Sequence, residues 1–171
     1  EQRGNDAVVT LPVNTDSDVV IGELNGQTVK NMENKVATLE IKTDNVTYTL
    51  PASQINIDSV SAQFGSQVAL NKIKVSIKIS EPPADTVKIM TDTANEGGYQ
   101  LVVQPVNFEI TCTHEDETVN ITSFSGYVER MIAIPDGVDP SKITTGIVLN
   151  SDGTFRHVPT TILLIEGRYY A

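Results

Sequence analysis

The sequence lacks tryptophan and has one cysteine among its 171 residues. That residue, Cys112, cannot form an internal disulfide, and cysteine use alone does not fix the cellular compartment. Basic residues are also few, since 12 Lys and Arg stand against 22 Asp and Glu, for a formal net charge of −10. Such a chain repels a phosphate backbone, so we expect no nucleic-acid partner. No apolar run approaches about 18 residues, so we expect no membrane span.

The composition is that of a folded β protein. Hydrophobic residues make up 39% of the chain and charged residues 20%, which lies inside the globular range. The apolar residues are largely Val and Ile, Thr is abundant, and β-branched side chains favour pleated, half-buried strands. The length allows one good core or two small ones of roughly 80 residues each. We therefore expect an all-β fold.

Two stretches alternate between apolar and polar residues with a period of two, which is typical of strands with one buried face. In "NKIKVSIKIS" the inward residues are Ile73, Val75, Ile77 and Ile79, and the outward ones are Lys72, Lys74, Ser76 and Lys78. In "PVNFEITCTHEDE" the inward residues are Val106, Phe108, Ile110 and Cys112. The run "ETVNITSF" returns after the charged "HEDE", so this second stretch predicts a hairpin.

Further hairpins are predicted where turn residues separate two apolar runs. Asn25-Gly26 is the strongest such signal, because both residues tolerate a positive φ. Asp44-Asn45 and Asp152-Gly153 occupy equivalent places, and "YVERMIAIP" adds another strand.

Helical signals are scarce. "INIDSVSAQFG" predicts a short helix with Asp58 as its N-cap and Gly65 as its end. "PADTVKIMTDTANEGG" predicts a second, with Asp85 as the cap and Gly97-Gly98 ending it. We therefore expect one or two short helices in an otherwise β chain.

The organisation along the chain favours two β subdomains. Turn signals recur about every 8 to 12 residues, which is the spacing of antiparallel sandwiches. Pro82-Pro83 stiffens the chain directly after a predicted strand and makes the best boundary. We predict an antiparallel, β-sandwich-like fold with subdomains at residues 7–81 and 85–171, and a single larger sandwich is the alternative.

The densest group of candidate metal ligands is "CTHEDE", which contains Cys112, His114, Glu115, Asp116 and Glu117. A zinc site needs three or four converging ligands, usually from two separated pairs, and the other histidine, His157, has no ligand-like neighbour. Cys112 is also in phase with the buried face of its strand. The pattern therefore favours a core cysteine followed by a solvated turn.

"NTDSD" places Asn14, Asp16 and Asp18 at alternate positions, as at the start of a calcium loop. Position six would be Val19 rather than Gly, and position twelve would be Asn25 rather than Glu, so the EF-hand template fails. A looser carboxylate site for calcium at a sandwich edge is the alternative.

Other candidate residues have simpler interpretations. Ser125 in "SFSGYVE" lacks the strand-turn-helix context of a nucleophile elbow. Asn45 and Asn120 each begin an Asn-X-Thr glycosylation pattern, and both lie in strand-turn contexts. A strip of aromatic side chains that binds sugars is another candidate, although core filling would explain most of them. The side chains are Tyr127, Phe155, Tyr169 and Tyr170. We predict no catalytic residue, no cofactor site and no metal site.

Several stretches together carry a family resemblance. They are "NTDSDVVIGELNGQTVKNME", "LEIKTDNVTYTLPASQINI", "KVSIKISEPPADTVK", "YVERMIAIPDGVDPSKITTGIVLNSDGTFRHVP" and "IEGRYYA". In order and spacing they resemble the module that precedes S-layer homology repeats in secreted proteins of Gram-positive bacteria. The resemblance runs over nearly the whole chain from about Val8.

The resemblance implies an extracellular, cell-wall-proximal module that is not itself an enzyme. In that family the module links an outer region, often a glycoside hydrolase, to repeats that grip the cell-wall polymer, and those repeats are absent here. The implied role is that of a structural spacer or interaction module whose partners are other modules of the same polypeptide. A carbohydrate- or wall-polymer-binding module, assisted by bridging calcium, is the alternative, with cell-wall polysaccharide as the partner.

The two ends of the sequence carry expectations of their own. The opening "EQRGNDAVV" is polar and shows no signal peptide. The resemblance also implies that Glu166-Gly167 is the turn into a strand that begins at Arg168. The family pattern continues beyond Ala171, so we expect the second subdomain to be truncated. Tyr169 and Tyr170 should then lie at a sheet edge, where the strand could pair with a second copy in an edge-strand dimer.

Overall fold

A computed structural model describes residues 6–15, 17–65, 68–150 and 153–171. The chain forms two compact units, one made of residues 1–80 with 107–130 and the other of residues 81–106 with 131–171. Within the described ranges, strands dominate and three short α-helices accompany them. The predicted all-β, sandwich-like fold class is confirmed.

The two units do not follow the predicted ranges 7–81 and 85–171. Residues 107–130 lie in the first unit, because residues 107–113 pair with Lys74–Ser80 over the whole length of that strand. The chain leaves the first unit after Ser80, returns to it for one hairpin, and leaves it again after Arg130. A division by sequence position could not anticipate this return, since it depends on a strand pairing between distant segments.

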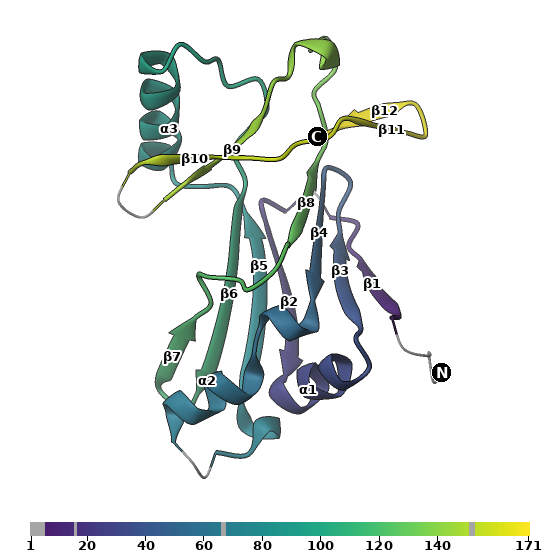
Figure 1. The fold of residues 1–171 in the computed structure, drawn as a ribbon, viewed down its shortest axis with the longest axis vertical. Coiled ribbons are helices and arrows are strands. Elements are labelled where there is room, and N and C mark those ends of the chain that lie inside the picture. The colour runs from purple at the N-terminus through teal and green to yellow at the C-terminus, as the bar shows by residue number, and fades with distance from the viewer. Residues whose placement is uncertain (1–5, 16, 66–67, 151–152) are drawn as a thin grey trace. The chain divides into compact units, whose positions relative to one another are not determined.

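The first sheet of the first unit has the strand order β1-β3-β4-β8 (Figure 1). Its strands are β1 (Val8–Pro12), β3 (Thr38–Lys42), β4 (Val46–Pro51) and β8 (Glu129–Ile132), which runs two residues past the end of this unit at Arg130. β3 and β4 form an antiparallel hairpin around Asp44-Asn45, as predicted. β1 pairs with β3 in parallel, which the expectation of an antiparallel fold missed.

The second sheet has the order β2-β5-β6-β7 (Figure 1). Its strands are β2 (Val19–Asn25), β5 (Lys74–Ser80), β6 (Asn107–His114) and β7 (Glu117–Asn120), each antiparallel to its neighbour. The predicted alternation holds on β5, where Val75, Ile77 and Ile79 are buried while the lysines face outward. The predicted hairpin at "HEDE" is also confirmed, with a positive φ at Glu115.

The apolar faces of the two sheets meet in one core. The rings of Tyr48 on β4 and Phe108 on β6 lie 4.8 Å apart between centroids. A Cβ atom at Gly22 of β2 would lie 2.9 Å from Cδ1 of Ile41 on β3, so glycine allows a close approach there. The largest fully buried side chains all belong to this unit, and they are Tyr48, Ile41, Leu50, Ile57, Ile73, Ile77, Ile110, Val29, Val60, Val75 and Cys112.

Asn25-Gly26 does not form the predicted hairpin turn; it begins helix α1 (Gly26–Asn34). Asn25 is the N-cap with extended dihedrals, and its Oδ1 accepts from the backbone N–H of Thr28 at 2.8 Å. A Cβ at Gly26 would lie 2.7 Å from the backbone oxygen of Leu70, so glycine serves a close approach here rather than a positive φ. The dipeptide Asn-Gly therefore starts a helix here, with asparagine as the cap and glycine at a close approach, instead of forming a turn with a positive φ.

The two predicted helices exist, but their caps differ from the prediction. α2 (Ile57–Phe64) is capped by Asn56, whose Oδ1 accepts from Ser59 N–H, and Asp58 lies in its first turn. α3 (Ala84–Glu96) begins after Pro83 without a side-chain cap, and Asp85 lies in its first turn. Both acids still suit the positive end of the helix dipole. No helix among the described residues is long and apolar enough to cross a membrane.

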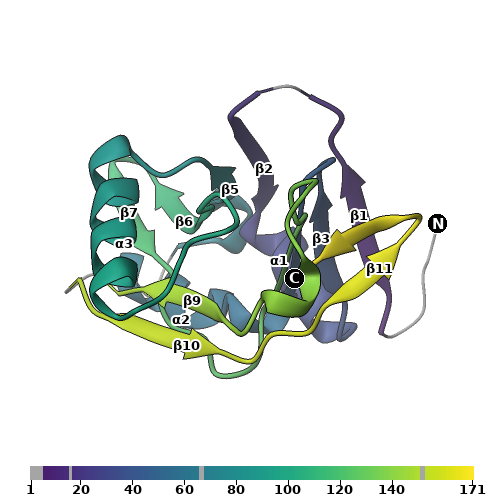
Figure 2. The ribbon, with the colours of Figure 1, turned by 90° about the horizontal axis from the view of Figure 1, so that it is seen from above.

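The second unit contains α3 and two hairpins, which appear as separate two-stranded ribbons in Figure 2. β9 (Gly146–Leu149) pairs with β10 (Phe155–Val158), and β11 (Leu163–Ile165) pairs with β12 (Arg168–Tyr170), both in antiparallel fashion. Asp152 of the first predicted turn lies outside the described residues. Short 3₁₀ turns complete the chain at Ala52–Gln54, Leu70–Lys72 and Pro140–Lys142.

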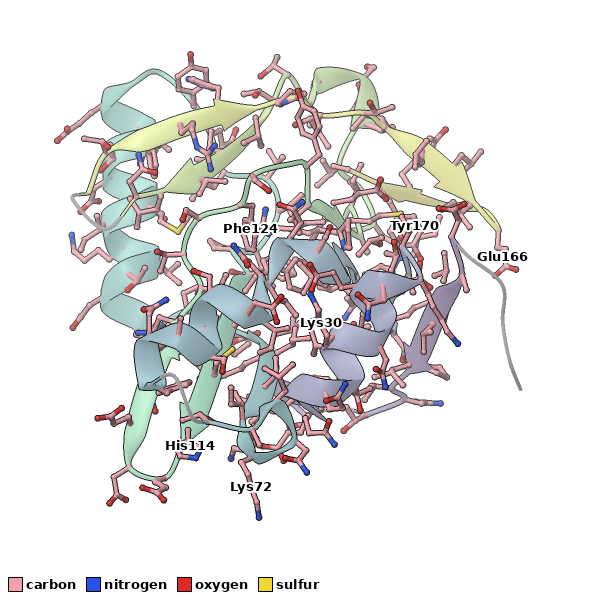
Figure 3. All side chains as sticks on the ribbon, turned by 60° about the horizontal axis from the view of Figure 1, so that its bottom comes forward. Lys30, Lys72, His114, Phe124, Glu166 and Tyr170 are labelled. Atoms are coloured by element: carbon pink, nitrogen blue, oxygen red, sulfur yellow. The ribbon has the colours of Figure 1, made fainter. Side chains whose placement is uncertain are left out.

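The C-terminal Tyr pair does not lie at a sheet edge, contrary to expectation. Glu166 and Gly167 form the predicted turn with φ values of 50° and 85°, and Glu166 marks the hairpin tip in Figure 3. On its other side β12 meets residues 132–134, because Ile134 N–H donates to Tyr169 O, and Ile132 and Ala171 exchange two hydrogen bonds. The free edge of this sheet is therefore β11.

The cap of α1 gives a direct test of the corrected fold. Replacing Asn25→Ala should lower the free energy of unfolding by about 1 kcal/mol, because the first turn loses its side-chain acceptor, whereas Asn25→Gly should cost only a few tenths. Urea denaturation measures both. Asn34→Ala, at the exposed far end of the same helix, is the control, and an equal loss in that variant would contradict the cap.

Candidate functional site

The most elaborate side-chain arrangement in the first unit is a cluster of aromatic rings around Arg130. Its guanidinium carbon lies 5.4 Å from the ring centroid of Tyr48, 5.2 Å from that of Phe108 and 6.0 Å from that of Phe124. β4, β6 and the loop before β8 each supply one ring. A desolvated cation over an aromatic face contributes about 0.5 to 2 kcal/mol, so the cluster ties three segments together.

Arg130 also interacts with the phenol of Tyr48. Burial raises the pKa of Tyr48, while the positive charge of Arg130 and a hydrogen bond from its side chain oppose that rise. Tyr48 is almost fully buried, so its hydroxyl needs such a partner. The arrangement therefore places a positive charge beside the polar end of an otherwise apolar core residue.

Gln54 also holds the loop of residues 121–128, at a point next to Phe124. Oε1 of Gln54 accepts from the backbone N–H of Gly126 at 2.8 Å and from Oγ of Ser125 at 3.3 Å. Gly126 also approaches this side chain closely, since a Cβ there would lie 3.0 Å from Nε2 of Gln54. Together with Phe124 under Arg130, labelled in Figure 3, these contacts fix the loop on the first unit.

This anchored loop presents Tyr127 to solvent, with 91% of its surface exposed. Core filling, the expected explanation for most of the aromatic candidates, does not apply to this ring. Phe155, Tyr169 and Tyr170 belong to the second unit, where Tyr169 and Tyr170 point to opposite faces of β12 as consecutive strand residues. Tyr127 is therefore the aromatic candidate best placed to contact a ligand or partner.

The residues of "CTHEDE" do not converge. Cys112 is fully buried on β6, and burial raises the pKa of its thiol to about 11, which keeps it protonated and unreactive near neutral pH. The ring of His114 lies against that of Phe64, 5.9 Å between centroids. Among the described residues, no three His, Cys, Asp or Glu side chains are grouped as a metal site. The interpretation of Cys112 as a core residue is confirmed.

The remaining candidates are dispersed. Asp16 of the "NTDSD" motif lies outside the described residues, Val19 begins β2 and Asn25 caps α1. Ser125 donates to Gln54, and the ring of His157 packs 5.5 Å from that of Tyr99. The two Asn-X-Thr asparagines, Asn45 and Asn120, are exposed beside β4 and at the end of β7.

The second unit has a groove of about 530 Å³ beside α3. Its walls are Val87, Thr91 and Asn95 of the helix, residues 100–105 and Pro135. None of these lining residues carries a charge, although the chain as a whole carries −10. The groove therefore suits a neutral ligand with both apolar and hydrogen-bonding groups, and it offers no group for acid-base chemistry.

Sequence reasoning missed Arg130, Gln54 and the groove. No sequence pattern marked Arg130, because its ring partners lie up to 82 positions away along the chain, at Tyr48. Gln54 follows a strand as an ordinary polar residue, and only the returning loop reveals its role. Searches against protein-family models, curated proteins and solved structures found no match to the chain.

Arg130→Lys tests the cluster. Lysine keeps the charge but loses the flat guanidinium that stacks on the rings, so we expect the free energy of unfolding to fall by about 1 to 2 kcal/mol. Urea denaturation gives the value, with Arg156→Lys at an exposed position of β10 as the matched control. Equal stabilities for the two variants would show that the ring contacts contribute nothing.

Proposed function

We propose that the chain is a non-catalytic spacer or interaction module of a bacterial S-layer-associated cell-surface protein. The observation that carries the proposal is the ordered set of family-like stretches from "NTDSDVVIGELNGQTVKNME" to "IEGRYYA". These stretches lie on β2 and α1, on β3 and β4, on β5, on β8 to β10 and on the final hairpin, so they draw on both units.

The proposed module is extracellular and joins an outer region, such as a glycoside hydrolase, to wall-anchoring repeats of the same polypeptide. A spacer needs a core that resists unfolding and proteolysis, and the facing sheets of the first unit supply one. The outer faces of its sheets should also not adhere to its neighbours. The net charge of −10 and the lysine–glutamate pairs on the outer face of the second sheet, Lys74–Glu23 and Lys78–Glu109, suit that need.

The chemistry of the described side chains supports a non-catalytic role. The thiol of Cys112 is buried and protonated, and the hydroxyl of Ser125 donates to an amide oxygen rather than to a base. The acidic residues of "HEDE" occupy an exposed turn. The proposal therefore assigns catalysis and wall anchoring to other modules of the parent protein.

A second candidate function is that of a carbohydrate- or wall-polymer-binding module, assisted by calcium. The observation that favours it is Tyr127, an almost fully exposed ring on a loop that is held in place at two points. Aromatic faces stack on the C–H groups of sugars, and a rigid platform lowers the entropic cost of doing so. The uncharged groove beside α3 would suit the same class of neutral ligand.

A binding titration separates the two functions. For a spacer, we expect no saturable binding of the chain to purified Gram-positive cell wall or to soluble glycans, with or without calcium. Cosedimentation and isothermal calorimetry measure it. Saturable binding would overturn the pure spacer role, and its loss in Tyr127→Ala but not in Tyr127→Phe would assign the binding to the ring.

A further inference from the structure

The second unit buries little apolar surface of its own. Among its described residues the buried apolar side chains are Ala94, Ala133 and Ile134, all others being half-buried or exposed. The exposed large ones are Ile89, Tyr99, Val102, Leu163, Leu164, Ile165 and Tyr169. Burying a single Leu or Ile is worth about 1.5 to 3 kcal/mol, so this unit has much to gain from a partner.

The densest part of that exposed surface is β11. Its three residues are consecutive and apolar, and Leu164 at the centre is 59% exposed. Tyr169 opposite Leu164 is exposed as well. A two-stranded hairpin is marginal in water unless further strands or a packed face support it, and β12 already has residues 132–134 on its other side. The side of β11 facing away from β12 is therefore where a further strand can add.

The backbone of β11 is oriented for such an addition. In a hairpin with a two-residue turn, Ile165 and Arg168 form the hydrogen-bonded pair next to the turn, so the following pair, Leu164 and Tyr169, turns its backbone groups outward. The carbonyl of Tyr169 does point away from β11, because it accepts from Ile134 N–H at 2.9 Å. By the same alternation, the N–H and C=O of Leu164 point to the open side.

β11 also lacks the features that usually protect an edge strand. Natural edges carry inward charges, proline or bulges that discourage pairing. Leu163–Ile165 has none of these, whereas the edge strand β1 ends in Pro12 and the edge strand β2 carries Glu23. Residues 159–171 contain one Glu and one Arg, so this hairpin is locally neutral in a chain of net charge −10.

We propose that β11 is a homotypic docking edge, which pairs antiparallel with β11 of a second copy of this chain. A two-fold axis at Leu164 makes the strand self-complementary, since Leu164 then faces Leu164 of the second copy and exchanges both backbone hydrogen bonds with it. Leu163 faces Ile165 of the second copy, which pairs apolar side chains on the same face. A strand that carries charges or proline would pair poorly with this edge. β11 of a second copy carries neither, so it is the best-suited occupant that the chain itself supplies.

The dimer is weak and salt-dependent. Three paired residues bury far less than the roughly 800 Å² per partner of a standard interface, so we expect a Kd at high micromolar concentration or above. Each copy carries −10, and the resulting repulsion is screened by added salt. Association should therefore strengthen as the ionic strength rises, unlike a dimer formed by opposite charges.

Sedimentation equilibrium from about 10 µM to 1 mM chain tests the proposal. We expect the mass to rise from monomer toward dimer, and Leu164→Lys to raise the Kd at least about tenfold by placing like charges across the axis. Leu164→Pro, which removes the outward N–H, should act in the same direction. Ile89→Lys is the matched control, because it puts the same charge at an exposed apolar position of α3 in the same unit.

The register has its own test. Leu164→Cys should cross-link two copies when diamide is added, since directly opposed residues of a hydrogen-bonded pair lie about 5.5 Å apart between Cα atoms, within disulfide reach. Ile89→Cys should not, and the native Cys112 is buried. A monomer at all concentrations, a mass that rises past the dimer, or a dimer unaffected by Leu164→Lys and Leu164→Pro would each overturn the proposal. The spacer function would survive each of these results, because its own test is the absence of saturable glycan binding and not self-association.

Discussion

The structure depends on the burial of one face of β5 between its neighbours and the opposite sheet. Ile73, Val75 and Ile77 are inaccessible to solvent, and β5 is the strand that joins β2 to β6 in the second sheet. The apolar inner face of such a strand must be covered by another layer, and here a second sheet covers it, at the usual spacing of about 10 Å. The closure of β6 onto β5 is what brings residues 107–130 back into the first unit.

Several other features follow from that closure. The return of β6 places Phe108 against Tyr48, and the loop after β7 then carries Phe124 to the guanidinium of Arg130. α1 contacts the 3₁₀ turns Ala52–Gln54 and Leu70–Lys72, and Lys30 on this helix pairs with Asp58 of α2 at 2.6 Å. The described residues of the second unit form no equivalent inner face, which explains both its exposed hairpin and the proposed pairing of β11.

Local patterns predicted the parts of the fold that depend on neighbours in sequence. Alternation in residues 73–79 gave the buried face of β5, and Asp44-Asn45 gave the hairpin of β3 and β4. The turn at Glu166-Gly167, which the resemblance implied, is present as well. Asn25-Gly26 misled because an asparagine cap and a hairpin turn use the same dipeptide, and the contact that decides between them, with Leu70, is 44 positions away. The Arg130 cluster and the strand beside β12 also join distant segments, so no local signal could predict them. The S-layer resemblance and the function drawn from it stay predictions.

The central claim is that stability resides in the facing sheets of the first unit, while the second unit opens more easily. Native-state hydrogen exchange tests it most directly, at a concentration where the chain is monomeric. We predict that the amides of Val75, Ile77 and Ile110 exchange only through global unfolding, and that the amides of β9 to β12 exchange through openings of clearly lower free energy. Equal protection of Ala171, which donates to Ile132, and Ile77 would contradict the account.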